Sequence, residues 1–144
     1  MPVVAVVMAG AMLASCAGSR GDADEELVVV APDPARDNSS PEAALAAIYA
    51  ELHEGDVQEA CTYVDETFKA AYDCEEVFSW YDDVDLEQMV GVQIDGDLVY
   101  YNDDGTAHVR AVALSWPDGR LVRGEERMFI ERGNGWFLTL TPFP

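Results

Sequence analysis

Apolar residues in the first half of the folded region recur at helical spacing. Ser40 is a suitable helix cap, and after it apolar side chains return every three or four residues until Gly55, a helix stop signal. Two further start signals, an aspartate followed three residues later by a glutamate, stand at Asp56 and Asp73. The pattern therefore predicts helices that begin near these three positions.

Past Asp85 the period of the pattern changes to two, as in Val90, Val92 and Ile94. Further alternating stretches are separated by turns rich in glycine, asparagine and aspartate. The predicted strands cover residues 90–94, 98–101, 106–116, 121–131 and 136–141. Helices followed by an antiparallel meander predict an α+β fold, with the helices packed on one face of a sheet of four to five strands.

The N-terminus carries an apolar run that is too short to span a membrane comfortably. This run, Val3–Leu13, ends in Leu13-Ala14-Ser15-Cys16, which resembles the bacterial lipobox. The resemblance implies transfer of a diacylglyceryl group to the Cys16 thiol and cleavage before this residue. The alternative is a short buried helix with an incidental cysteine. No Lys or Arg precedes the run, so either translation starts upstream of Met1 or the leader is weak.

Three segments follow from this interpretation: a lipoprotein signal peptide over 1–15, a flexible tether over 16–39 and a domain over 40–144. The tether is rich in Gly, Ser, Asp, Glu and Pro. Only Leu27-Val28-Val29-Val30 interrupts it, and this run is able to dock on the domain as an edge strand. The expected location is the extracytoplasmic face of the cell membrane, with lipid as the anchor.

The charge of the chain excludes one class of partner. The chain has 28 acidic residues against 8 basic ones, and its formal net charge is -20. Such a chain repels nucleic acid, so we do not expect nucleic-acid binding. The acids are unevenly spread, because Lys69 is the only Lys or Arg between Glu42 and Asp104. The simplest interpretation of these acids is a solvated acidic helical face.

With Cys16 assigned to lipid, Cys61 and Cys74 remain, and an even pair in an exported domain predicts a disulfide. On one straight helix their Cα atoms would lie about 20 Å apart, whereas a disulfide needs them within about 7 Å. The pair therefore predicts a helix break near Val64-Asp65, with Asp65 capping a short helix. The alternative is two buried free thiols.

Three segments of the chain resemble the NTF2-like superfamily, in particular its small secreted or lipid-anchored actinobacterial members. They are PEAALAAIYAELHEGDVQEAC from Pro41, YDCEEVF around the last cysteine and GEERMFIERGNGWFLTL near the C-terminus. The resemblance covers Pro41–Phe143 and implies a cone in which helices cap a curved antiparallel sheet. It informs fold better than function, since none of these segments is a catalytic motif. Dimerisation through the sheet is common in proteins of similar fold, so a homodimer is a possible partner state.

Some members of that superfamily have a pocket between sheet and helices. The candidate pocket residues here are His108 and Arg110 on a strand, Tyr63 and Asp65 on the second helix, and Tyr49 on the first. For His108 the simpler interpretation is a partly exposed strand histidine. No catalytic aspartate and tyrosine set of the isomerase branch is recognisable, so no catalytic residue is assigned.

The sequence predicts neither a metal site nor a cofactor. The carboxylate clusters lack the spacing of a calcium loop, and the two histidines are far apart for zinc. The main functional hypothesis is therefore a membrane-anchored, non-catalytic module that binds a ligand or another protein. A pocketed isomerase or dehydratase is the alternative, and a structural envelope protein is the third possibility.

Overall fold

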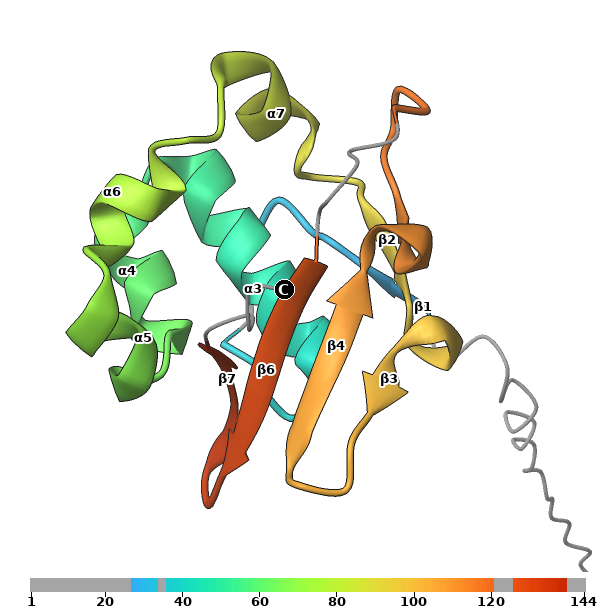
Figure 1. Cartoon of the computed structure of the whole chain (residues 1–144). Coiled ribbons are helices and arrows are strands. Elements are labelled where there is room, and N and C mark those ends of the chain that lie inside the picture. The colour runs from blue at the N-terminus through green and yellow to red at the C-terminus, as the bar shows by residue number, and fades with distance from the viewer. Residues whose placement is uncertain (1–26, 34–35, 121–125, 140–144) are drawn as a thin grey trace, which may run out of the picture.

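A computed structural model describes residues 27–33, 36–120 and 126–139 of the chain, and it is an α+β structure (Figure 1). The helices are α3 Pro41–Glu54, α4 Val57–Ala60, α5 Glu66–Ala71, α6 Cys74–Phe78 and α7 Asp83–Gln88. Short 3-10 helices are η1 Cys61–Tyr63, η2 Gly96–Leu98 and η3 Ala111–Ala113. The strands are β1 Leu27–Val29, β2 Gln93–Asp95, β3 Tyr100–Tyr101, β4 Thr106–Arg110, β5 Leu114–Ser115, β6 Glu126–Arg132 and β7 Gly135–Thr139.

The predicted helix starts are confirmed by side-chain caps. The Ser40 hydroxyl accepts the amide of Ala43, and Gly55 ends α3 in the left-handed conformation with φ 86°. Asp56, Asp65 and Asp73 cap α4, α5 and α6 in the same way. The predicted break before Asp65 is also confirmed, because an extended Val64 separates η1 from α5.

Four antiparallel strands form the larger sheet in the order β3-β4-β6-β7, and α3 packs across one of its faces (Figure 1). The interior between helix and sheet is filled by side chains. Tyr49 from α3, together with Ala107, Val109 and Phe129 from the sheet, is fully buried at 0% exposure. Burial of each large apolar side chain stabilises the fold by roughly 1.5–3 kcal/mol. The side chains packed between α3 and the sheet are therefore the main source of stability.

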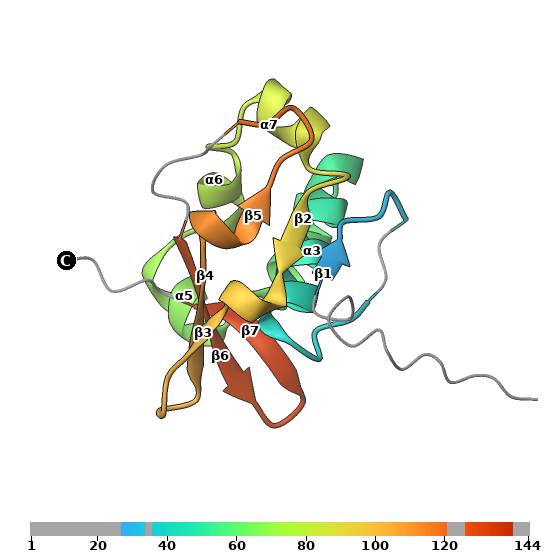
Figure 2. The same ribbon diagram turned by 90° about the vertical axis from the view of Figure 1, so that its right-hand side faces the viewer.

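A second sheet of three strands, in the order β1-β2-β5, lies beside the first (Figure 2). The prediction of one strand over 106–116 is wrong, because η3 breaks it and sends β5 into the second sheet. The buried positions explain the break. They fall on odd numbers at Ala107 and Val109 but on an even number at Leu114. A period-two strand cannot change parity without an irregular residue, so the chain bends there.

Other strand boundaries also differ from the prediction. Of the strand expected over 98–101, Tyr100–Tyr101 forms β3, whereas Leu98 belongs to η2. The Asp95 side chain caps η2 by accepting the amide of Asp97. The strand expected over 90–94 is shifted to Gln93–Asp95. The predicted strand over 121–131 is seen from Glu126, and its first five residues lie outside the described part, as do residues 140–141 of the last one.

The apolar run within the expected tether docks on the domain. Val28 pairs with Ile94 in the antiparallel register of β1 and β2, and Val30 is buried at 1% exposure. The described fold therefore begins at Leu27 rather than at Ser40. The predicted signal peptide and Cys16 lie outside the described residues. Within the described residues no helix is long and apolar enough to cross a membrane.

Two other segments form hydrogen bonds with the outer edge of β7. A covered edge strand cannot pair with the edge of another sheet, which prevents aggregation. The Trp136 amide donates to the Asn38 carbonyl at 2.8 Å, and the Asp65 amide donates to the Leu138 carbonyl at 2.7 Å. Gly135 makes room for the first contact, since a Cβ there would lie 2.6 Å from the Asn38 side-chain nitrogen. The segments before α3 and α5 are thereby fixed to the sheet.

Candidate functional site

The five candidate pocket residues do not meet in one cavity. Tyr49 belongs to the core, where its ring contacts Tyr81 at 6.2 Å and Trp116 at 5.7 Å between centroids. Ala107 and Val109 face that core, so the alternation of β4 directs His108 and Arg110 to the opposite face of the sheet. Tyr63 and Asp65 lie at the far edge, beside β7. The predicted set is therefore split among three places.

His108 has a structural partner on the neighbouring strand. Its Nδ1 lies 2.6 Å from Oε1 of Glu126, and its side chain is 17% exposed. Arg110 at the end of the same strand is exposed and lies over the Tyr100 ring, with 5.8 Å from its guanidinium carbon to the ring centroid. These contacts bind adjacent strands to one another.

Asp65 has two structural tasks at the edge of the sheet. It caps α5 by accepting the Thr67 amide at 3.1 Å, and it binds Arg132 through both carboxylate oxygens at 3.0 and 3.1 Å. The hydrogen bond from Arg132 is the largest cause that lowers the pKa of Asp65 from 3.8 to about 2, with those from Thr67 adding to it against the opposing effect of burial. A carboxylate this acidic is a poor general base near neutral pH.

This ion pair predicts an acid-sensitive part of the stability. Because the folded pKa of Asp65 lies below its unfolded value, its contribution is complete above about pH 4 and is lost as pH falls towards 2. Asp65→Asn keeps a capping side chain but loses the charge. This substitution should lower the free energy of unfolding at pH 7 by roughly 1–2 kcal/mol. The value allows for solvent, which screens the half-exposed Arg132 and weakens the ion pair.

The measurement is urea unfolding of both proteins between pH 7 and pH 2. The two curves should converge as the pH approaches 2. Asp73→Asn, at the equivalent cap of α6, is the matched control and should show a smaller loss at pH 7. A difference between wild type and Asp65→Asn that persists unchanged at pH 2 would contradict the role of the ion pair.

Tyr63 is the one candidate whose polar atom is left without a partner. Its side chain is 5% exposed, and its hydroxyl is buried without a hydrogen bond among the described residues. Burial is the main cause that raises the pKa of Tyr63, with Arg36 opposing it and Glu51 adding to it. The neutral phenol is therefore stable at physiological pH, and no general base adjoins it by a hydrogen bond.

The two cysteines of the domain form the predicted disulfide. Cys61 and Cys74 are joined with an S–S distance of 2.05 Å and a Cα–Cα distance of 6.1 Å. The bond fixes η1 to the first residue of α6. It leaves these two sulfurs unavailable for metal binding. Within the described part of the chain, no group of three or more His, Cys, Asp or Glu side chains is placed to hold a metal ion.

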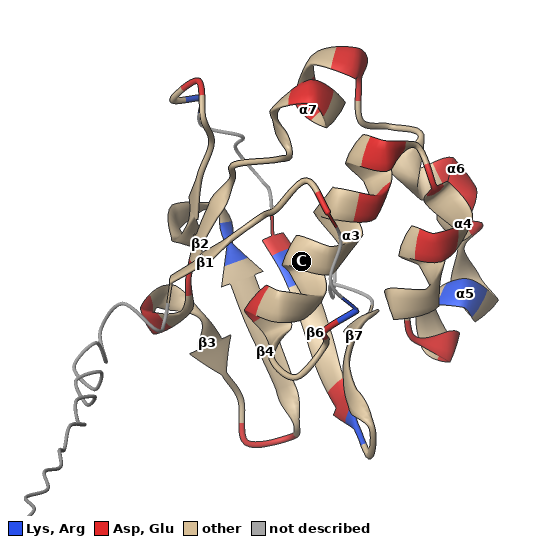
Figure 3. Ribbon diagram, turned by 180° about the vertical axis from the view of Figure 1, so that it is seen from behind, with Lys and Arg blue, Asp and Glu red and all other residues tan. Residues whose placement is uncertain are grey.

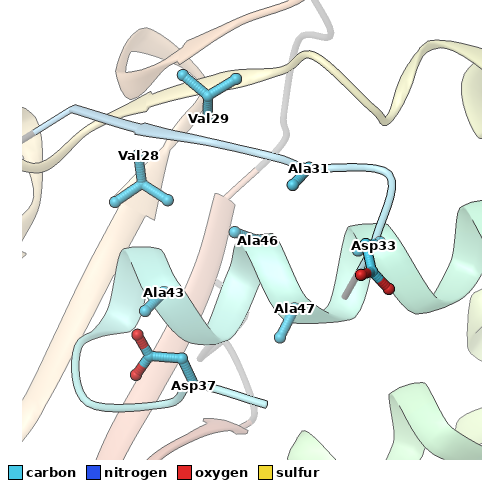
Figure 4. Close-up of a pocket in the computed structure, with 9 residues that line it drawn as sticks. Val28, Val29, Ala31, Asp33, Asp37, Ala43, Ala46 and Ala47 are labelled. Carbon is cyan, nitrogen blue, oxygen red and sulfur yellow. The ribbon is translucent and has the colours of Figure 1, made fainter. Parts of the chain in front are cut away.

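A groove that the sequence did not reveal lies between β1 and α3 (Figure 4). Its volume is about 120 Å³, and its floor consists of small residues at helical spacing, Ala43, Ala46, Ala47 and Ala50. Val28 points from β1 towards this floor, whereas Val29 points away. Asp33 and Asp37 border the groove, and the hydroxyl and amide of Ser39 lower the pKa of Asp37 by hydrogen bonding.

The size of the groove limits what it can enclose. Pockets for small-molecule substrates usually measure about 300–1,000 Å³. The alanine repeat in AALAAIYA is the one sequence feature that could have indicated the groove. The same repeat is typical of an ordinary buried helix face, so it was not informative. The docking of the apolar run onto this helix, which the alanines allow, creates the groove.

No family model, no curated protein and no solved structure matches this chain.

Proposed function

We propose that the mature chain begins at Cys16 and is held at the extracytoplasmic face of a membrane by lipid on that cysteine. The observation that carries the proposal is the disulfide between Cys61 and Cys74. Disulfides persist in exported proteins and are rare in reducing compartments. Of the three cysteines in the chain, the bond uses two, and the third stands in the lipobox-like Leu13-Ala14-Ser15-Cys16.

The folded domain in this proposal is a non-catalytic module that binds a ligand or another protein. Three features support this. The space between α3 and the sheet is filled by fully buried side chains. The polar candidates are divided between opposite faces, and Asp65 is held by Arg132. The groove beside β1 is smaller than a usual substrate pocket. Among the described residues, the polar candidates that the isomerase-type alternative would use do not converge on one cavity.

The finer fold assignment belongs to the same proposal. A helical layer on one face of an antiparallel sheet and the closing β6–β7 hairpin support an NTF2-like cone. The additional sheet formed by β1, β2 and β5 would be this chain's own elaboration of that plan. Two surfaces are left for partners, a second copy of the chain included: the acidic residues on the helices (Figure 3) and the open face of the four-stranded sheet, which is turned to the viewer in Figure 1.

The mass of the natural protein tests the anchor directly. We expect protein extracted from membranes with detergent to carry Cys16 as its first residue, with diacylglyceryl on the sulfur. Mass spectrometry of the intact protein and of its N-terminal peptide measures both. An unmodified Cys16 in a chain that still contains residues 1–15 would overturn the proposal.

A further inference from the structure

Exposed apolar side chains gather on the outer side of the three-stranded sheet. Alternation along β1 places Leu27 and Val29 on the face opposite Val28, which points to α3 (Figure 4). The 3-10 helices η2 and η3 pack against each other, and η2 also contacts β1 (Figure 2). Leu98 in η2, which contacts β1, and Val112 in the adjacent η3 are both exposed. We call this surface the Leu27 patch; its members and their exposures are Leu27 44%, Val29 51%, Leu98 44% and Val112 67%.

The rim of the patch has the chemistry of a membrane interface. Tyr100, which follows η2, is 57% exposed and carries the Arg110 guanidinium over its ring. Tyrosine and arginine combine an apolar body with a polar end, which suits the headgroup level of a bilayer. Asp95 and Asp97 also lie at this rim, so the patch is not uncharged.

The covalent path from the proposed anchor leads into this patch. Leu27 is both a patch residue and the first described residue of the domain, and Cys16 lies 11 positions upstream. A chain of that length spans at most about 40 Å when fully extended. A domain of this size has a radius of gyration of about 13 Å. The extended length exceeds the width of the domain, but a flexible chain of this length has an r.m.s. end-to-end distance of only about 17–20 Å. On average the connection therefore keeps the patch side near the membrane.

The distribution of charge favours the same orientation. Acidic residues crowd α3, α4, α6 and α7 (Figure 3). An anionic lipid surface repels such a face over about a Debye length, and more strongly than it repels the patch, whose rim carries Asp95 and Asp97 but also Arg110. The orientation that turns the helices away from the bilayer has the lower electrostatic cost.

We propose that the Leu27 patch lies on the lipid surface to which Cys16 is anchored, so that the domain has a fixed orientation and presents its acidic helices outward. The inference rests on the proposed anchor and deepens it by naming lipid as the partner of this face. The lipid on Cys16 supplies the membrane affinity, and the patch supplies the orientation. The helical face is thereby left free for an extracytoplasmic partner.

The test uses two tryptophan variants of the full, lipidated protein in phosphatidylcholine vesicles. Val112→Trp reports from the patch, and Val84→Trp on α7 is the matched control, since Val84 is also an exposed valine at 51%. Vesicles in which the lipid carries bromine near the top of the acyl chains quench nearby tryptophan. After subtraction of the parent protein's signal, we expect clear quenching of Val112→Trp and none of Val84→Trp. Leu98→Trp repeats the measurement if Val112→Trp does not fold.

Equal quenching of the two variants, or none of either patch variant, would overturn the orientation. A patch buried by a second copy, seen as a dimer in sedimentation together with unquenched Val112→Trp, would overturn it as well. Flotation of the parent protein with the vesicles separates the two proposals. Flotation without patch quenching leaves the anchor intact and refutes the orientation, whereas a parent protein that does not float refutes the anchor and the inference that depends on it.

Discussion

Cys16→Ser should release the protein from the membrane fraction. A serine hydroxyl does not replace the thiol that accepts diacylglyceryl, and cleavage before residue 16 follows that transfer. Without lipid, two apolar contacts remain: the uncleaved run Val3–Leu13, which is too short to span a membrane comfortably, and the small Leu27 patch. Neither is sufficient for stable attachment, since even one acyl chain gives only marginal binding. We therefore expect nearly complete loss of the variant, which keeps residues 1–15, from washed membranes, measured by fractionation and immunoblotting.

The control for this experiment comes from the other cysteines. The double variant Cys61→Ser/Cys74→Ser removes the disulfide but keeps Cys16, so it should stay in the membrane fraction as far as it folds. The pair of results separates loss of lipid from loss of any thiol. A Cys16→Ser protein that remains attached and lipidated would disprove the anchor.

Removal of the disulfide should have the largest effect on stability. The bond closes a loop with a sequence separation of 13, for which loop entropy gives about 3 kcal/mol. This loop contains η1 and α5 and ends at the first residue of α6. The three helices have 3, 6 and 5 residues. Helices this short are not stable alone. Cys61→Ala/Cys74→Ala should therefore lower the Tm by roughly 10–20 °C.

Calorimetry of the oxidised protein, the reduced protein and the double variant measures this effect. Reduction of the wild type should reproduce most of the loss, because both treatments free the same loop. If the two cysteines were instead buried free thiols, reductant would leave the Tm unchanged. A Tm that does not respond to reductant, with both thiols alkylatable in the untreated protein, would contradict the bond.

Local signals determined four of the five described α-helices; α7 was not predicted, although Asp82 and Asp85 form a capping box at its start. A cap depends on a side chain and an amide two or three residues away, as in Ser40 with Ala43 and Asp65 with Thr67. Such contacts depend only on residues that are close in sequence and not on the tertiary fold. The starts of α3 and α5 therefore followed from the residues alone. Alternation also separated Ala107 and Val109 from His108 and Arg110 on β4, but it did not specify which face packs on α3.

The candidate pocket was beyond the reach of local signals. The residue types of His108 and Asp65 suggested chemistry, but their partners are Glu126 and Arg132, 18 and 67 positions away. Such partners occupy the polar atoms and turn candidate catalytic groups into structural ones. The disulfide was accessible because the exported context and an even pair of cysteines left few alternatives.

By itself, then, the sequence determined the α+β class, the helix starts, the pairing of Cys61 with Cys74 and a lipidation motif at Cys16 that remains a prediction. Only the tertiary structure decided that η3 bends the chain into a second sheet, that Leu27–Val29 docks as β1, and that a groove and the Leu27 patch result. The physical reason is range. Caps and alternation are set by neighbours within a few residues, whereas strand partners and surfaces depend on which distant segments bury their apolar faces together.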